Sequence, residues 1–460
     1  MVKPSASTSP HTAQRVTYGD VLKLAWPASI AASVTPLLGA IDVWALAHSP
    51  HPLDVAAVGL GSIIFSLAYW SFGFIRMSVA GLTAQASGAE DQREERAALA
   101  RGIAIGAIIG VILVCLQRPV QEIAFPLLAL DSEASTQTLN TALDYYGIRI
   151  WGAPFAIATY ALFGWLTAKG RTDFLMIASI TIAALNAALD YWFVAKFGWG
   201  AGGVAAGTLI AEIFGFVIAA AFVASILAKE SGLFAHWKEI DYFSINAFRR
   251  TLSVNRDIFL RTLLLSFSFA WFTQRSGAFG DVTLAANQVL LQLFLFTGLA
   301  LDGTAIAAET LIGRAIGDRD RLRGQIKLKS AMKATFIPAI IIALCFTAFY
   351  LIAGNWIISV LTQPGEIRAT SNAYLVWIII SPLVVVTSFQ LDGVFIGATK
   401  AKEMRNGMII SVAIYILASI YLAKTYSNHG LWAAFSLFFI ARAVTLGWYF
   451  IRQKMWTLEK

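Results

Sequence analysis

The sequence has few charged residues for its length. Lys, Arg, Asp and Glu make up 13% of its 460 residues, whereas hydrophobic residues make up 58%. A typical soluble domain has about 25% charged residues, and the mean hydropathy here is +0.68. One soluble core cannot bury so much apolar surface, so the composition excludes an ordinary cytoplasmic enzyme and indicates a membrane protein.

Cysteine and histidine are also scarce. The two cysteines, Cys115 and Cys345, lie in separate apolar stretches, which excludes a disulfide framework and a CxxC metal or redox site. The five histidines are scattered over the N-terminal tail and the loops, and HExxH, GxSxG, Walker and dinucleotide-binding motifs do not occur. We therefore expect no enzyme activity and no cofactor, and the sequence identifies no metal site with certainty.

Long apolar stretches dominate the chain instead. Each is long enough for a helix to cross a hydrocarbon core of about 30 Å. We predict twelve spans at 24–47, 55–86, 98–125, 142–168, 173–195, 202–228, 251–275, 282–312, 330–352, 368–398, 405–424 and 429–451. The first twenty residues lack the pattern of a signal peptide, so the first span is expected to remain in the mature protein.

The positions of Lys and Arg predict the orientation in the membrane. The N-terminus, the even-numbered loops with their adjoining span ends, and the C-terminus hold 27 of the 35 basic residues, and the odd-numbered loops hold 5. Both termini are therefore expected in the cytoplasm. The longest basic loop is predicted from Lys229 to Arg261. Because the basic residues lie in short loops, the net charge of +8 does not indicate a nucleic-acid partner.

The two halves of the chain are similar in sequence. A shift of 229 residues aligns Gly88 with Gly317, Asp91 with Asp320 and Gly164 with Gly393, and one deletion then aligns Pro154 with Pro382. Six spans in each half mean that both halves enter from the same side, related by a pseudo-two-fold axis along the membrane normal. The sequence therefore predicts an all-α membrane protein with twelve transmembrane helices in two six-helix lobes.

This repeat predicts the division of the chain. The parts are a cytoplasmic N-terminal tail 1–23, an N-terminal lobe 24–228, a cytoplasmic linker 229–250, a C-terminal lobe 251–452 and a cytoplasmic tail 453–460. A cleft is expected between the lobes.

Polar residues inside the first-lobe spans form the main candidate site. An ionisable group at the bilayer centre costs about 2.5–3.5 kcal/mol, so it must be paired, hydrated or functional. Asn186 and Asp190 lie four residues apart and share one helical face. With Asp42 and Thr208 they are expected to form an oxygen-lined pocket; the alternative for each Asp is a structural, hydrogen-bonded carboxylate. Pro27 and Pro36 in the first span can bend its helix.

Further charges lie within the predicted spans. Asp302, Glu309, Asp392 and Arg442 belong to the second lobe, where Asp302, Asp392 and Arg442 are predicted to form a structural charge network. Arg76 is expected either to pair with a lobe carboxylate or to reach the membrane interface. Arg149 and Glu212 are expected to be interfacial or packing residues. A cleft surface is the other possible location for Phe65, Tyr69, Arg76 and Tyr160. The rings of the three aromatic residues can accept cations there.

Several of these stretches resemble a known family. The duplicated twelve spans, Pro27 followed fifteen residues later by Asp42, and the segment from Asn186 to Glu212 resemble the multidrug and toxic compound extrusion (MATE) family. His51 to Gly88 resembles its DinF-like bacterial branch. The resemblance implies two bundles in a V arrangement that export amphipathic, often cationic compounds in exchange for inward H+ or Na+.

The same resemblance implies roles for particular residues. Asp42, Asn186, Asp190 and Thr208 would form the proton or cation site, with Na+ possible at the first three, and Pro27 would bend the first helix. It also implies a bacterial inner-membrane protein whose partners are small amphipathic substrates and membrane lipids, and we expect a monomer.

The sequence departs from the family pattern in two places. Thr159 and Tyr160 stand where many members have an Asn in the fourth span. The seventh span has only Asp257 near its start, so Asp392 lacks the Glu partner of a second-lobe Na+ site. A lipid-linked oligosaccharide flippase of the same superfamily is the alternative function, and an embedded enzyme or a receptor are more distant ones.

Overall fold

The computed structural model describes residues 15–46, 49, 53–129, 135–230, 232 and 245–458, without the side chains of 35–37, 40, 127–129, 245–248 and 250. Most of the predicted N-terminal tail, most of the predicted linker and the last two residues lie outside this described part. The described elements are α1 (Tyr18–Leu46), α2 (Asp54–Phe72), α3 (Phe74–Gly88), α4 (Gln92–Cys115), α5 (Gln117–Ala129), α6 (Thr136–Arg149), η1 (Ile150–Gly152), α7 (Ala153–Ala168), α8 (Thr172–Asp190), η2 (Tyr191–Lys196), α9 (Gly200–Glu230), α10 (Ile245–Gly277), α11 (Asp281–Gly317), α12 (Arg321–Leu361), α13 (Glu366–Gly397) and α14 (Ala401–Arg452).

These helices correspond to the twelve predicted spans. Within the described residues, nine helical segments are long and apolar enough to cross a membrane. One of them, α14, contains two spans, because the backbone leaves helical geometry at Ser427 (φ 50°, ψ −134°). With α1 and α10 they make up the twelve-helix, all-α fold, which is confirmed. The largest error is in α12, which extends well beyond the predicted 330–352 because its basic first turns continue the helix past the apolar stretch.

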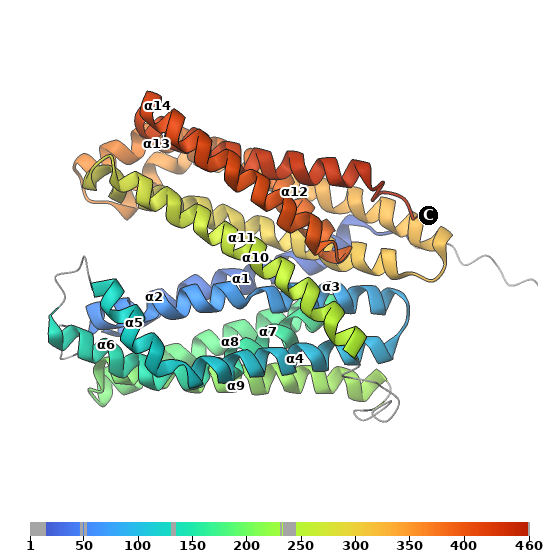
Figure 1. Ribbon diagram of the computed structural model, residues 1–460, viewed down its shortest axis with the longest axis horizontal. Helices are drawn as coiled ribbons and strands as arrows, with labels where there is room; N and C mark the ends of the chain where they lie inside the picture. Colours follow the sequence, from blue (N-terminus) through green and yellow to red (C-terminus); the bar gives the residue numbers. More distant parts are fainter. Residues whose placement is uncertain are drawn as a thin grey trace, which may run out of the picture.

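The helices form two bundles with separate cores (Figure 1). Helices α1 to α9 form the first lobe, whose core includes the buried Tyr145 and Trp165. Helices α10 to α14 form the second lobe around Trp432 and Phe435. Figure 1 shows the lobes lying close together toward the end with the C-terminus and diverging toward the other end. We call the former end, which also holds the basic loops after α3 and α11, the basic end.

Glycines at equivalent repeat positions allow the lobes to touch at the basic end. A Cβ on Gly88 would lie 2.1 Å from the carbonyl oxygen of Arg314, and a Cβ on Gly317 would lie 2.0 Å from that of Gln85. The repeat aligns Gln85 with Arg314, so the two contacts are reciprocal. Both partners also donate across the junction, Gln85 Nε2 to the Gly397 carbonyl at 2.9 Å and Arg314 Nη2 to the Ala168 carbonyl at 2.7 Å. This exchange is the pseudo-two-fold symmetry that the repeat predicts.

The aligned aspartates have the same structural role in each lobe. Asp91 Oδ1 accepts hydrogen bonds from the backbone N–H groups two and three residues later, both at 3.1 Å, and thereby caps α4. Asp320 Oδ1 caps α12 in the same way at 3.0 and 3.2 Å. A side chain that satisfies free N–H groups stabilises a helix start. The repeat therefore preserves the turn that begins each of these helices.

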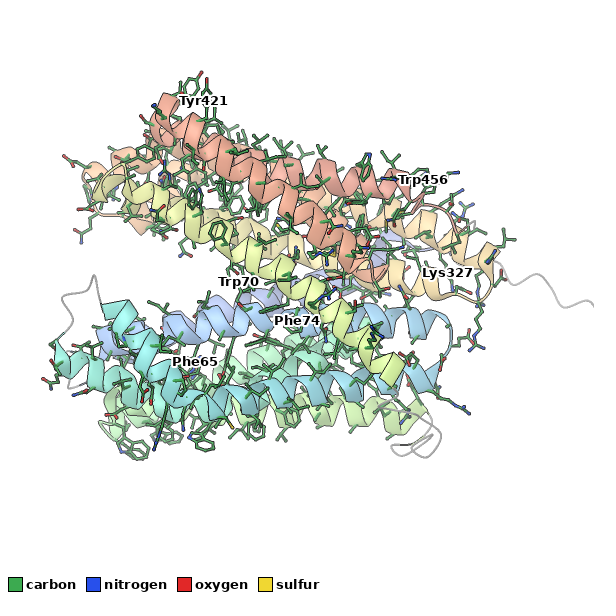
Figure 2. All side chains as sticks on the ribbon, in the orientation of Figure 1. Phe65, Trp70, Phe74, Lys327, Tyr421 and Trp456 are labelled. Carbon is green, nitrogen blue, oxygen red and sulfur yellow. The ribbon has the colours of Figure 1, made fainter. Side chains whose placement is uncertain are left out.

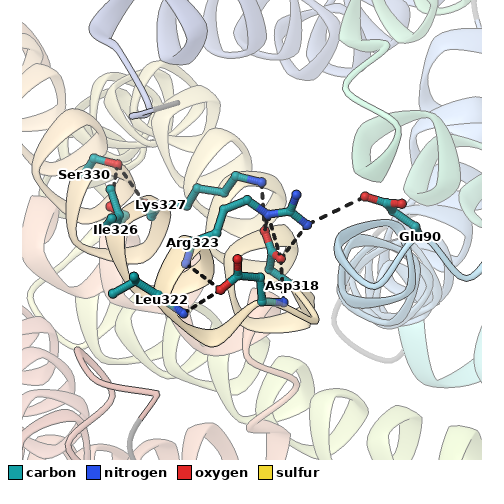
Figure 3. Close-up of polar contacts among 8 residues, drawn as sticks. Glu90, Asp318, Leu322, Arg323, Ile326, Lys327 and Ser330 are labelled. Atoms are coloured by element: carbon teal, nitrogen blue, oxygen red, sulfur yellow. Dashed lines mark hydrogen bonds and ion pairs between the residues drawn. The ribbon is translucent and has the colours of Figure 1, made fainter. Parts of the chain in front are cut away.

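An ion-pair cluster adds to the contact at the basic end (Figure 3). Asp318, in the turn between α11 and α12, accepts from Arg323 Nε and Lys327 Nζ, each at 2.8 Å. Arg323 also reaches Glu90 of the first lobe, with 3.7 Å between Nη2 and Oε1. Burial acts to raise the pKa of the Asp318 carboxyl, but the hydrogen bonds from Arg323 and Lys327 outweigh it and hold that pKa below its usual value.

Candidate ion-coupling site

Two carboxyl groups meet inside the first lobe. Asp42 on α1 is 8% exposed, and Asp190 at the end of α8 is fully buried. The π-helical turn η2 begins immediately after Asp190. The two side chains lie within hydrogen-bonding reach of each other. Because two ionised carboxylates repel each other, such an approach favours a proton shared between them. The predicted pairing of Asp42 with Asp190 is thus present in the structure.

Asn186 and Thr208 lie beside the pair, as the sequence predicts. Asn186 Nδ2 donates to Thr208 Oγ1 at 3.3 Å, and Thr208 Oγ1 donates to the Val204 carbonyl at 2.9 Å. Asn186 Oδ1 and both carboxylate oxygens of Asp190 are buried and accept no hydrogen bond of normal geometry. Buried oxygens of this kind are costly unless a proton or a cation satisfies them. The pocket is therefore suited to binding one.

Gly207 on α9 creates room for this pocket. A Cβ at position 207 would lie 2.4 Å from Asp190 Oδ1. Only glycine therefore allows α9 to lie so close to the acidic end of α8. Sequence reasoning missed this residue, because a glycine-rich helix start predicts close packing without saying which side chain approaches it.

The structure excludes the interfacial alternative for Arg149 and Glu212. Their side chains are 14% and 12% exposed and form an ion pair inside the first lobe, with 3.8 Å between Nη2 and Oε1. Tyr69 donates to Glu212 Oε2 at 3.4 Å, and Arg149 donates to the Tyr145 hydroxyl. The signal that could have found this pair is the presence of opposite charges inside the predicted spans 142–168 and 202–228.

The aromatic residues predicted for a cleft belong to the first-lobe core or pack against it, and Figure 2 labels Phe65 in that lobe. Phe65 is 2% exposed within the first-lobe core, where the Arg149 guanidinium lies 4.5 Å from its ring centroid. The cleft position is thus wrong for Phe65. Tyr69 and Tyr160 lie close enough to Glu212 to interact electrostatically. Rings that contact the second lobe include Trp70, 6.0 Å from Phe269, and Phe74, 5.5 Å from Phe259, between centroids.

Arg76 takes the first of its two predicted alternatives. Its Nη1 lies 3.5 Å from Glu309 Oε2, so a first-lobe arginine pairs with a second-lobe carboxylate. Asp302 lies near enough to interact electrostatically with Arg76 and with Asp392. The ion pair of Arg76 with Glu309 therefore joins the two lobes. Glu309 pairs with this first-lobe arginine and not with the arginines of the second-lobe network.

The second-lobe network contains Arg261 in addition to the predicted residues. Asp392 accepts from Arg442 Nη2 at 2.5 Å, as predicted, and also from Arg261. Arg261 lies within α10, which begins at Ile245, and so belongs to the predicted span 251–275 and not to the end of the basic loop. Helix α1 is continuous through Pro27 and Pro36, and the side chain of Pro36 lies outside the described residues.

Two repeated helical lobes with a carboxyl pair buried in one of them define a multi-pass membrane transporter rather than an enzyme. A sequence model of the MatE family matches residues 27–192 and 258–425. The chain belongs to this family, the MATE transporters.

Two relatives agree with this assignment. DNA damage-inducible protein F of Escherichia coli K12 is 34% identical over 423 residues, which cover 92% of this chain and 90% of the relative. This match confirms the resemblance to the DinF-like branch. A probable multidrug resistance protein NorM of Neisseria meningitidis serogroup A is 26% identical over 333 residues, covering 71% of this chain and 70% of the relative.

Solved structures agree on the fold. A variant of a Vibrio cholerae MATE transporter has a TM-score of 0.82 at 17% identity, covering 95% of this chain and 98% of that one. A MATE family transporter in an outward-facing conformation has a TM-score of 0.80 at 18% identity, covering 98% and 99%.

Proposed function

We propose that the protein is a secondary antiporter that exports amphipathic, cationic compounds in exchange for inward H+ or Na+. The observation that carries this proposal is the buried pair of Asp42 and Asp190, which presents unsatisfied oxygens inside one lobe. Relatives named for multidrug resistance and multidrug export support the substrate class. The proposed location is the bacterial inner membrane, where the protein is a monomer surrounded by lipid with both termini in the cytoplasm.

The proposed mechanism is alternating access between the lobes. Lobes 24–228 and 251–452 move as units joined by a cytoplasmic linker 229–250. In the present conformation they touch at the basic end, through Gly88 and Gly317, and the excess of Lys and Arg assigns that end to the cytoplasm. Inward opening must break this contact. Ion and substrate exchange if each binds one conformation better than the other.

Rings between the lobes suit a cationic substrate. The ring centroids of Trp70 and Phe269 lie 6.0 Å apart, and those of Phe74 and Phe259 lie 5.5 Å apart, each pair joining the two lobes. Ring faces attract cations and apolar groups alike. A substrate that separates the lobes would therefore meet aromatic surface from both.

The flippase alternative is less favoured by charge. A pyrophosphate-linked lipid requires a surplus of positive charge between the lobes. The junction pair and the second-lobe network together instead balance three arginines with three carboxyl groups, namely Arg76, Arg261, Arg442, Asp302, Glu309 and Asp392.

The test is efflux of a fluorescent cationic dye from proteoliposomes under separately imposed pH and Na+ gradients. Wild type is expected to transport dye with one gradient, and Asp42→Asn is expected to lose this while remaining folded. Asp281→Asn, which changes an exposed carboxylate at the start of α11, is the matched control. Equal transport by wild type and Asp42→Asn would contradict the proposal.

A further inference from the structure

Arg149 occupies an unusual position for a permanent charge. It ends α6, where the short helix η1 interrupts the path to α7, and its side chain is enclosed by the first lobe. Its charge acts on three carboxyl groups from three helices, namely Asp42 of α1, Asp190 of α8 and Glu212 of α9.

The surroundings of Arg149 are built to hold it in place. Tyr145 accepts from its guanidinium, Phe65 lies under the same group, and Glu212 pairs with it. Gly152 provides the space for Glu212, because a Cβ there would lie 1.9 Å from Oε2. The other ionisable groups facing Arg149 are the hydroxyls of Tyr69 and Tyr145. A guanidinium stays charged at any physiological pH, so the pocket always contains this cation.

We propose that Arg149 is a built-in counter-cation that makes the first-lobe site selective for H+ over Na+. This inference rests on the proposed antiport and deepens it by naming the coupling ion. Arg149 acts as a specificity-determining residue, because its charge acts on Asp42 and Asp190 from its place beside Glu212.

The selectivity follows from how each ion binds. Both ions carry one positive charge, so Arg149 repels both to a similar extent. A carboxylate nevertheless holds H+ in a covalent O–H bond, with a dissociation constant of about 10⁻⁴ M even in water. Na+ is held only by the electrostatic attraction of several oxygens. The approach of the buried Asp42 and Asp190 carboxyl groups additionally favours a shared proton, so proton binding withstands the repulsion by Arg149, whereas the purely electrostatic binding of Na+ is lost.

The charge balance of the pocket agrees with this reading. When the pair of Asp42 and Asp190 loses its proton, Arg149 and its partner Glu212 stay in place, and the positive charge of Arg149 weakens the attraction of the pocket for a second cation.

The experiment measures Na+ binding by thermal unfolding of the purified protein, with KCl replaced stepwise by NaCl at constant ionic strength. In wild type and in Arg149→Lys, which keeps the charge, the unfolding temperature is expected to be the same in NaCl as in KCl. Arg149→Gln is expected to be stabilised by Na+ over K+, with an apparent Na+ affinity raised about tenfold or more. Arg452→Gln, at the exposed end of α14, is the matched control for loss of a cation.

A second pair of variants covers the case in which Arg149→Gln does not fold. Glu212→Gln keeps the Arg149 cation, so its unfolding temperature is expected to be insensitive to Na+. The double variant Arg149→Gln, Glu212→Gln removes both charges, and Na+ is expected to raise its unfolding temperature. A wild-type response to Na+, or folded Arg149-deficient variants that respond no more than wild type, would overturn the inference. If wild type moves no dye under either gradient, the antiport proposal fails, and the unfolding readout still decides the role of Arg149.

Discussion

Arg76 of α3 and Glu309 of α11 form an ion pair across the junction between the lobes, with 3.5 Å between Nη1 and Oε2. The Glu309 side chain is 2% exposed, so Glu309→Gln leaves Arg76 with an uncompensated charge in a mostly closed junction. We expect a loss of about 1–3 kcal/mol in the free energy of unfolding. Thermal unfolding of Arg76→Gln, Glu309→Gln and the double variant measures the coupling. Simple addition of the two single effects would show that the pair contributes nothing.

Asp392 forms ion pairs with two buried arginines. Replacing Asp392 is therefore expected to lower the free energy of unfolding more than replacing either arginine. Asp392→Asn leaves both Arg261 and Arg442 without their carboxylate, and breaking a buried pair costs about 3–5 kcal/mol. Arg261→Gln removes one cation while Arg442 keeps its partner, so a smaller cost is expected. Unfolding midpoints in detergent compare the two variants. Equal midpoints would show that Asp392 does not hold both guanidinium groups.

The glycine contact at the basic end predicts a way to force the lobes apart. A side chain at position 317 meets the Gln85 carbonyl oxygen at 2.0 Å from its Cβ, so Gly317→Val requires the lobes to separate there. We expect a longer distance between spin labels on Ala89 and Arg319, in a background without Cys115 and Cys345. Gly447→Val is the control, because a Cβ at 447 has nothing within 4 Å. An unchanged distance in Gly317→Val would contradict a tight closure.

The ion-pair cluster around Asp318 predicts an acid dependence. Hydrogen bonds from Arg323 and Lys327 overcome the effect of burial and lower the pKa of this carboxyl in the folded protein. Its contribution to stability is therefore complete above about pH 4 and is lost as the pH falls through the lowered folded pKa. Asp318→Asn is expected to have a lower unfolding midpoint than wild type at neutral pH. Its midpoint is expected to fall less than that of wild type on acidification. Parallel curves of unfolding midpoint against pH would contradict this role.

The spans, the repeat and the acidic pair were predictable from the sequence for physical reasons. Apolar length determines where a helix can cross a membrane, and the break at Ser427 falls between the two predicted last spans. The alignment of Gly88 with Gly317 corresponds to real reciprocal contacts. The pairing of Asp42 with Asp190 followed from the cost of burying a charge.

The remaining features depend on tertiary contacts that no local pattern encodes. Arg149 and Glu212 are far apart in sequence, and only the packing of α6 against α9 joins them. Arg261 lies in the predicted span 251–275, but its pairing with Asp392 depends on the packing of α10 within the second lobe. The space that Gly207 leaves for Asp190 depends on how closely α8 and α9 approach.

The central claim is that the Asp42 and Asp190 pair couples proton movement to export. The most direct test imposes a gradient of a cationic dye on proteoliposomes that contain a trapped pH indicator, with no initial pH difference. Wild type is expected to move protons against the direction of dye flow, and Asp42→Asn is expected to move none. Dye movement by wild type without proton movement, or unchanged proton movement in Asp42→Asn, would contradict the account.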